Sequence, residues 1–149
     1  MHESGLEAFD TTLRKTQLWI KEIMHALHFQ DRHLAYLALK GVLHSLRDRL
    51  PVDEAVQLGA QLPMLVRGLY YEGWRAAGKP LRERHQEAFL MDAMKYFGEG
   101  ALTALLTPPR TEAADVVRAV LRVLSRHTTE AASLRSLLSA DLRALWPEN

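Results

Sequence analysis

Cysteine is absent from the 149 residues of this chain. Disulfide bonds, zinc sites built on thiolates and cysteine nucleophiles are therefore excluded. Neither charge dominates, because 19 basic and 18 acidic residues leave a formal net charge of +1. A dedicated nucleic-acid-binding domain usually carries a larger positive excess, so the overall charge argues against that class.

Long hydrophobic runs are also absent. No stretch approaches the roughly 20 apolar residues that cross a bilayer, and residues 1–5 do not start a secretion signal. We therefore expect a cytoplasmic protein with no membrane segment. The proportions of hydrophobic residues (48%) and charged residues (25%) are those of an ordinary globular protein. We expect a single helical domain over residues 1–149.

Apolar residues recur at helical spacing through most of the sequence. One stripe predicts a helix over about 10–28, with Asp10, Thr11 and Thr12 as its cap, and consists of Phe9, Leu13, Thr16, Ile20, Ile23 and Leu27. Asp31 caps the next predicted helix. Similar patterns predict helices at about 31–50, 51–62, 63–69, 89–97, 101–106, 111–124, 130–138 and 140–146, with a loop at 107–110. No segment alternates with the period of a strand, so the predicted class is all-α.

The chain contains an internal repeat. Residues 42–46 (VLHSL) and 54–58 (EAVQL) are matched by residues 120–124 (VLRVL) and 130–134 (EAASL). A third block at residues 67–70 (RGLY) is matched by residues 143–146 (RALW). Such similarity predicts two related helical repeats, about 9–74 and 81–147, that pack as one bundle about a pseudo-twofold axis and cover each other's apolar faces.

Several segments resemble a known family of bacterial proteins of unknown function, DUF2267. They lie at residues 16–20, 31–36, 43–51, 59–63, 67–74 and 141–147. The resemblance implies a small α-helical protein built from a duplicated unit. It implies no catalytic residue and no cofactor.

Arginine and aromatic residues of the first repeat form the main candidate binding surface. Arginines at the end of the second predicted helix either complement the partial charge on its last carbonyl groups or bind an anion. The aromatic residues either seal the seam between the repeats or form a partner surface, where Tyr, Trp and Arg are common hot spots. The candidate residues are Arg47, Arg49, Gln61, Arg67, Tyr70, Tyr71 and Trp74.

Basic residues form a second candidate site. Lys40 and His44 in the first repeat align with Arg118 and Arg122 in the second, so each half offers a basic stripe. Two adjoining stripes would bind nucleic acid or another polyanion in a salt-dependent manner. The alternative is that both stripes are ordinary solvated helix faces.

Metal binding and catalysis have little support. His25 and His28 share a helix with Glu22, but the second half has no matching ligands. Ser45 and His44 are adjacent on a helix and therefore do not face each other. We predict no metal site, no cofactor and no catalytic residue.

Three functions remain open. The first is a non-enzymatic helical module for protein–protein interaction, which binds a partner or forms a homodimer. The second is binding of nucleic acid or another polyanion through the basic stripes. The third is a small-ligand protein or enzyme with a pocket between the repeats.

Overall fold

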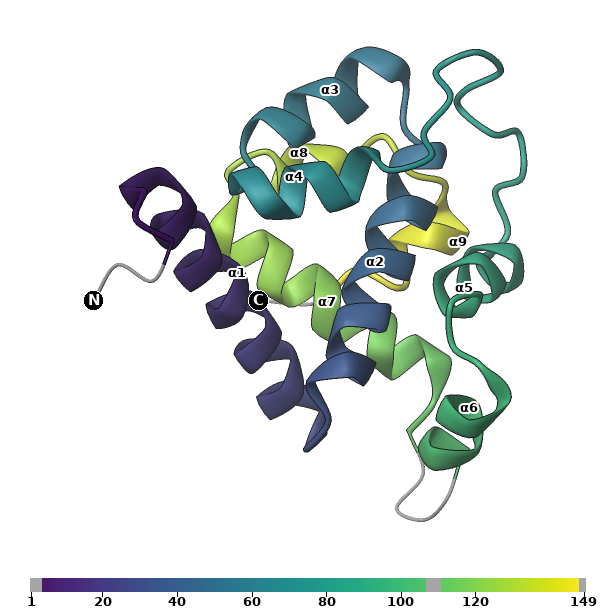
Figure 1. The fold of residues 1–149 in the computed structure, drawn as a ribbon. Coiled ribbons are helices and arrows are strands. Elements are labelled where there is room, and N and C mark those ends of the chain that lie inside the picture. Colours follow the sequence, from purple (N-terminus) through teal and green to yellow (C-terminus); the bar gives the residue numbers. More distant parts are fainter. Residues whose placement is uncertain (1–3, 107–110, 148–149) are drawn as a thin grey trace.

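A computed structural model describes residues 4–106 and 111–147. All regular secondary structure in these residues is helical, which confirms the all-α prediction (Figure 1). The predicted loop at 107–110 lies outside the described residues. No helix in the described part of the chain is both long enough and apolar enough to cross a membrane.

The described helices follow the order of the sequence patterns closely. They are α1 (Glu7–Leu27), α2 (Arg32–Asp48), α3 (Val52–Ala60), α4 (Met64–Tyr71), α5 (Gln86–Met94), α6 (Glu99–Leu106), α7 (Ala113–His127), α8 (Ala131–Arg135) and α9 (Ala140–Arg143). The longest segment between helices in the described residues connects α4 to α5, where the sequence carries the expected Gly and Pro breaks.

One of the two helix caps predicted from the sequence is present in the structure. Asp31 caps α2 as predicted, because its side chain accepts a hydrogen bond from the His33 backbone N–H at 2.8 Å. The predicted cap of α1 is wrong, since this helix already begins at Glu7. Asp10 accepts a hydrogen bond from the Ser4 hydroxyl at 2.7 Å, and the Thr12 hydroxyl accepts one from the backbone N–H of Leu65 at 2.8 Å.

Helix α2 is the central element of the fold. Its residues from Gly41 to Arg47 are all buried, and it packs against α1, α4, α5 and α7. The closest approach is to α5, where a Cβ atom at Gly41 would overlap the backbone carbonyl group of Ala93. A glycine at this position therefore sets the spacing between α2 and α5.

The two halves of the chain share one hydrophobic core. Leu43 of α2 and Leu121 of α7 belong to the same buried cluster. Polar contacts also join the halves. The Gln86 backbone N–H, at the start of α5, donates a hydrogen bond to the Asp141 carboxylate at 2.6 Å, across 55 positions of sequence.

The contact at Gly41 gives a stability prediction. Gly41→Ala raises helix propensity, but its methyl group must displace the α5 backbone, so we expect about 3 kcal/mol of destabilisation. Chemical denaturation monitored by circular dichroism measures this difference. An unchanged or increased free energy of unfolding would show that α2 and α5 are not packed this closely.

Candidate functional site

Arg47 lies in the interior and stabilises the end of a neighbouring helix. Its guanidinium group donates to the backbone carbonyls of Tyr70 at 2.6 Å and Glu72 at 2.8 Å, where α4 ends. It also forms an ion pair with Asp48 at 3.0 Å. The last carbonyl groups of a helix carry partial negative charge and lack partners within the helix. The Arg47 side chain therefore caps the C-terminus of α4.

Arg49 is also buried and joins α2 to α5. Its Nη2 atom lies 2.8 Å from the Asp92 carboxylate, and Nη1 donates to the Ser45 carbonyl at 3.1 Å and the Ser45 hydroxyl at 3.0 Å. The Ser45 hydroxyl donates onward to the Phe89 carbonyl at 3.0 Å. Both arginines therefore face internal partners.

His44 is buried between α4 and Tyr96, with both ring nitrogens engaged. Nε2 lies 2.7 Å from the Leu69 carbonyl oxygen, and Nδ1 lies 2.7 Å from the Tyr96 hydroxyl. A carbonyl oxygen only accepts, so Nε2 carries the proton and the neutral ring accepts from Tyr96 at Nδ1. Burial lowers the pKa of His44, and the nearby Arg47 and Lys40 lower it further.

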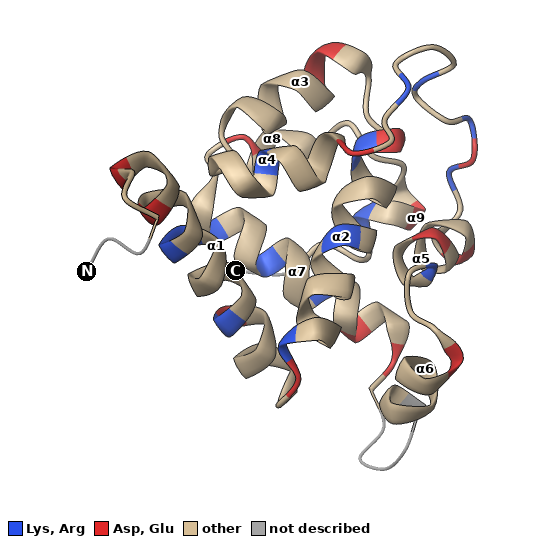
Figure 2. Cartoon of the chain, in the orientation of Figure 1, with Lys and Arg blue, Asp and Glu red and all other residues tan. Residues whose placement is uncertain are grey.

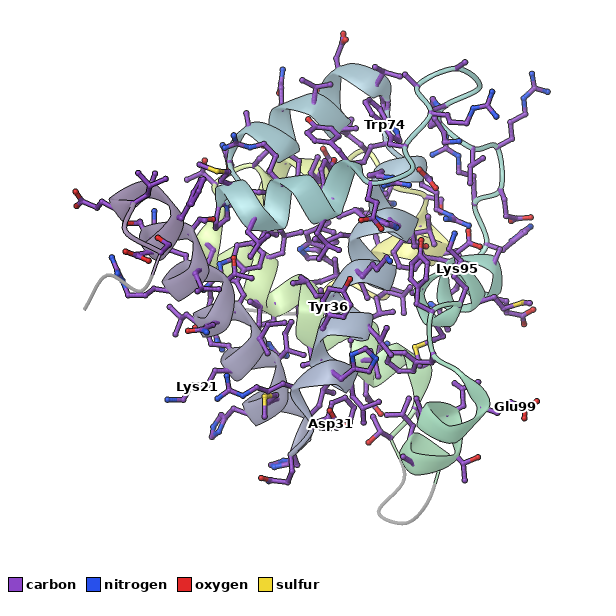
Figure 3. All side chains as sticks on the ribbon, in the orientation of Figure 1. Lys21, Asp31, Tyr36, Trp74, Lys95 and Glu99 are labelled. Atoms are coloured by element: carbon purple, nitrogen blue, oxygen red, sulfur yellow. The ribbon has the colours of Figure 1, made fainter. Side chains whose placement is uncertain are left out.

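The predicted aromatic cluster is partly internal. Tyr70 is buried, its hydroxyl donates to the Ala55 carbonyl at 2.6 Å, and burial raises its pKa. Tyr71 and Trp74 are half-buried, with ring centroids 5.6 Å apart. Figure 3 shows Trp74 beside the end of α2 opposite Asp31. The cluster covers α3 and leaves only the outer faces of Tyr71 and Trp74 accessible.

Gln61 and Arg67 are exposed residues that stabilise helix ends. The Gln61 side-chain oxygen accepts hydrogen bonds from the Thr129 and Glu130 backbone N–H groups at 2.9 and 3.0 Å, which joins the two halves of the chain. Arg67 donates to the Gly59 carbonyl at 3.0 Å, at the end of α3. The seven candidate residues therefore do not form one exposed surface.

The two basic stripes face different neighbours. Lys40 forms an ion pair with Glu72 at 3.1 Å, which raises the pKa of Lys40, and His44 is buried. Arg122 is exposed on α7, and Arg118 donates to a backbone carbonyl at 3.4 Å. Figure 2 shows acidic residues interspersed with basic ones over the helices. The four residues of the stripes therefore differ in their exposure and in their partners.

No metal centre was predicted from the sequence. Within residues 4–106 and 111–147, no cluster of three or more potential ligands among His, Cys, Asp and Glu has a geometry that could hold a metal ion. His127 lies 2.7 Å from Glu22, but this pair has no third ligand in the described structure.

An apolar groove of about 680 Å³ lies between α1, α2 and α4. Ile20 of α1 and Leu69 of α4 contribute apolar surface, and the fully buried Leu39 of α2 lies beneath it. Tyr36 and Leu65 are exposed at the margins of the groove. Figure 3 labels Tyr36 in front of the central helices. Gly68 also lines this groove, and a Cβ atom placed there meets no atom within 4 Å. The absence of a side chain at this position keeps the groove open.

An exposed apolar ridge extends along α1 beside the groove. Its residues are Phe9 and Leu13, which lie on the same helix face as Ile20 of the groove, and Leu6, which directly precedes the helix. Phe9 is 50% exposed and Leu13 40% exposed. In Figure 1 the first turns of α1 extend beyond the other helices. The sequence pattern predicted one buried stripe, but only its later half is covered.

The fold thus defines an all-α protein organised around a buried central helix that carries a few polar residues with internal partners. A family model described as "Uncharacterized conserved protein (DUF2267)" matches residues 16–145. This match covers most of the chain, and the protein belongs to the DUF2267 family, which confirms the resemblance noted in the sequence. A search of curated proteins gave no match. The family description names no activity, so function has to be inferred from the surface.

The buried His44 gives a pH prediction. Its pKa in the folded protein lies below the ordinary value of 6.5, so only the unfolded chain takes up this proton as the pH first falls below that value. The stability contributed by the neutral ring is therefore complete above about pH 6.5 and decreases as the pH falls toward the lower, folded pKa.

We expect His44→Gln to reduce the loss of stability between about pH 7 and pH 5. His85→Gln is the matched control, because the His85 side chain is 80% exposed. Thermal melts across this pH range test the prediction. A slope that is the same in both variants would contradict it.

Proposed function

We propose that this protein is a non-enzymatic helical interaction module that forms a homodimer through the apolar groove and the α1 ridge. The observation that carries the proposal is the unpaired ridge of Leu6, Phe9 and Leu13 next to a groove of the same chemistry. An amphipathic helix whose apolar face fits an apolar groove is a common mode of protein recognition.

A second copy of the chain fits both features at once. In a twofold dimer each ridge enters the partner's groove, so one symmetric contact covers two exposed apolar surfaces. Because the ridge and the groove lie on one face of α1, antiparallel pairing of the two α1 helices achieves this arrangement. Burial of Phe9 and Leu13 supplies the hydrophobic free energy of association.

This proposal moves the interface away from the residues that the sequence favoured. Tyr71 and Trp74 offer a smaller accessible surface, because each packs against the other and Tyr70 is buried. Binding of nucleic acid or another polyanion has weaker support, since Lys40 and His44 already have internal partners. Arg122 remains exposed on α7.

We also propose that the chain consists of two related helical units. Matching side chains support this interpretation. Arg67 donates to the Leu62 carbonyl at 2.9 Å, and Arg143, its partner in the repeat, donates to the Leu138 carbonyl at 3.2 Å. In each repeat an arginine of the last helix thus donates to a carbonyl in the turn that precedes this helix. The pseudo-twofold relation between the units stays a prediction.

Substitution of the ridge tests the dimer. Phe9→Glu places a charge in the proposed interface and should weaken association by about 30-fold or more, equal to about 2 kcal/mol. Light scattering over a concentration series, at low and high salt, measures the mass. Met91→Glu is the matched control, because Met91 is 75% exposed on α5, away from the groove.

The expected result is a dimer that persists in high salt for the unmodified protein and for Met91→Glu, and a monomer for Phe9→Glu. A monomer of the unmodified protein at every concentration would contradict the proposal. Loss of the dimer in Trp74→Ala, with Phe9→Glu unaffected, would assign the interface to the aromatic cluster instead.

Gly68 provides an independent test from the groove side. Gly68→Ala should stabilise the fold by about 0.5–1 kcal/mol, because α4 gains helix propensity and the added methyl group meets open space. Gly68→Leu should keep the fold but fill the groove and abolish the dimer. Thermal melts and light scattering separate these effects. A dimer that tolerates leucine at this position would exclude the groove from the interface.

A further inference from the structure

A second concave site lies on the other flank of α1. It is a pocket of about 550 Å³ between α1, the turn from α3 to α4 and the end of α7. Its volume falls within the range of roughly 300–1,000 Å³ that is usual for small-molecule sites. It is lined by side chains from both halves of the chain, including Trp19 from the first and His127 from the second.

Trp19 gives the pocket a rigid aromatic wall. The residue is only 2% exposed, and its ring stacks on His127 with centroids 5.1 Å apart and an interplanar angle of 22°. The His127 ring is held in turn by the Glu22 carboxylate at 2.7 Å. Among the described residues, the buried side-chain nitrogens without a hydrogen-bond partner belong to Arg49 and Trp74. Trp19 therefore contributes aromatic surface to the pocket and not a buried free donor.

Cationic groups complete the lining. Lys15 forms no ion pair in the described part of the chain. Arg67 is fixed through Nε and Nη2, which donate to the Gly59 and Leu62 carbonyls at 3.0 and 2.9 Å, so its Nη1 remains without a partner. No carboxylate lines this pocket. Two cationic groups, with no carboxylate in the lining of the pocket, favour a ligand that carries negative charge.

We propose that this pocket binds a small organic anion, a carboxylate or phosphate monoester with an aromatic or apolar body. The body lies over the exposed side chain of Leu18 beside the edge of Trp19, and the anionic group is bound by Lys15 and Arg67. Apolar residues at the turn from α3 to α4, among them Pro63 and Met64, cover the remaining surface of the ligand. The site goes beyond self-association, because the ridge and the pocket occupy different flanks of α1.

NMR of the three tryptophan indole groups tests the proposal. The probes are phenyl phosphate and benzoate, with neutral benzamide and inorganic phosphate as comparisons. At least one aromatic anion should shift the Trp19 indole resonance and leave those of Trp74 and Trp146 unchanged. Trp19→Phe assigns the resonance. The two aromatic anions distinguish carboxylate from phosphate ligands.

Lys15→Met should raise the dissociation constant about tenfold, the effect of losing one charge-assisted contact. Lys21→Met is the matched control, because this exposed lysine of α1 does not line the pocket. Phe9→Glu should bind the probe normally, which keeps this test separate from that of the dimer.

Three results would overturn the proposal. The first is the absence of a Trp19 shift with both aromatic anions. The second is equal binding of benzamide or inorganic phosphate, which would remove the need for the charge or for the apolar body. The third is an unchanged dissociation constant in Lys15→Met.

Discussion

The buried guanidinium group of Arg47 is the interaction on which the arrangement around α2 depends. A charged group in the interior is tolerated only when its donors are satisfied. Arg47 meets this requirement by binding the last carbonyls of α4 and the Asp48 carboxylate. Since α4 must end at this point, Tyr70 is placed over α3, and the groove between α4 and α2 forms beside it.

The same requirement explains how α2 can carry polar residues within a mostly apolar buried surface. His44 of α2 and Arg49, directly after it, are buried, and each has a partner on another helix. Hydrogen bonds of this kind fix the relative positions of helices more narrowly than apolar contacts, because each donor requires its acceptor at one distance and angle. Gly41 then permits the close approach to α5 that brings Asp92 within reach of Arg49.

Local patterns in the sequence predicted the helices well, and tertiary contacts explain where prediction failed. The apolar stripe from Phe9 to Leu27 predicted α1 correctly. Periodicity shows which side of a helix is apolar, but it does not show which other elements pack on that side. The exposed ridge at Phe9 and Leu13 could therefore not be predicted. Lys40, His44 and Arg47 share one side of α2, which reads as a solvated face in the sequence. Their hydrogen-bond partners on α4, in the residues after it and on Tyr96 are distant along the chain, and no local pattern signals them. Trp19 and His127 likewise meet only in the folded protein.

The hydrogen bond between Gln86 and Asp141 has a consequence for the order of folding during synthesis. Helix α5 packs against α2, yet its first backbone N–H receives its carboxylate partner only after a further 55 residues have been made. The ribosome therefore releases α2 and α5 before the residue that binds the N-terminus of α5 has been made. The buried surface of α2 packs against α5 and α7 as well as against α1 and α4, so it is completely covered only when the second half of the chain is present.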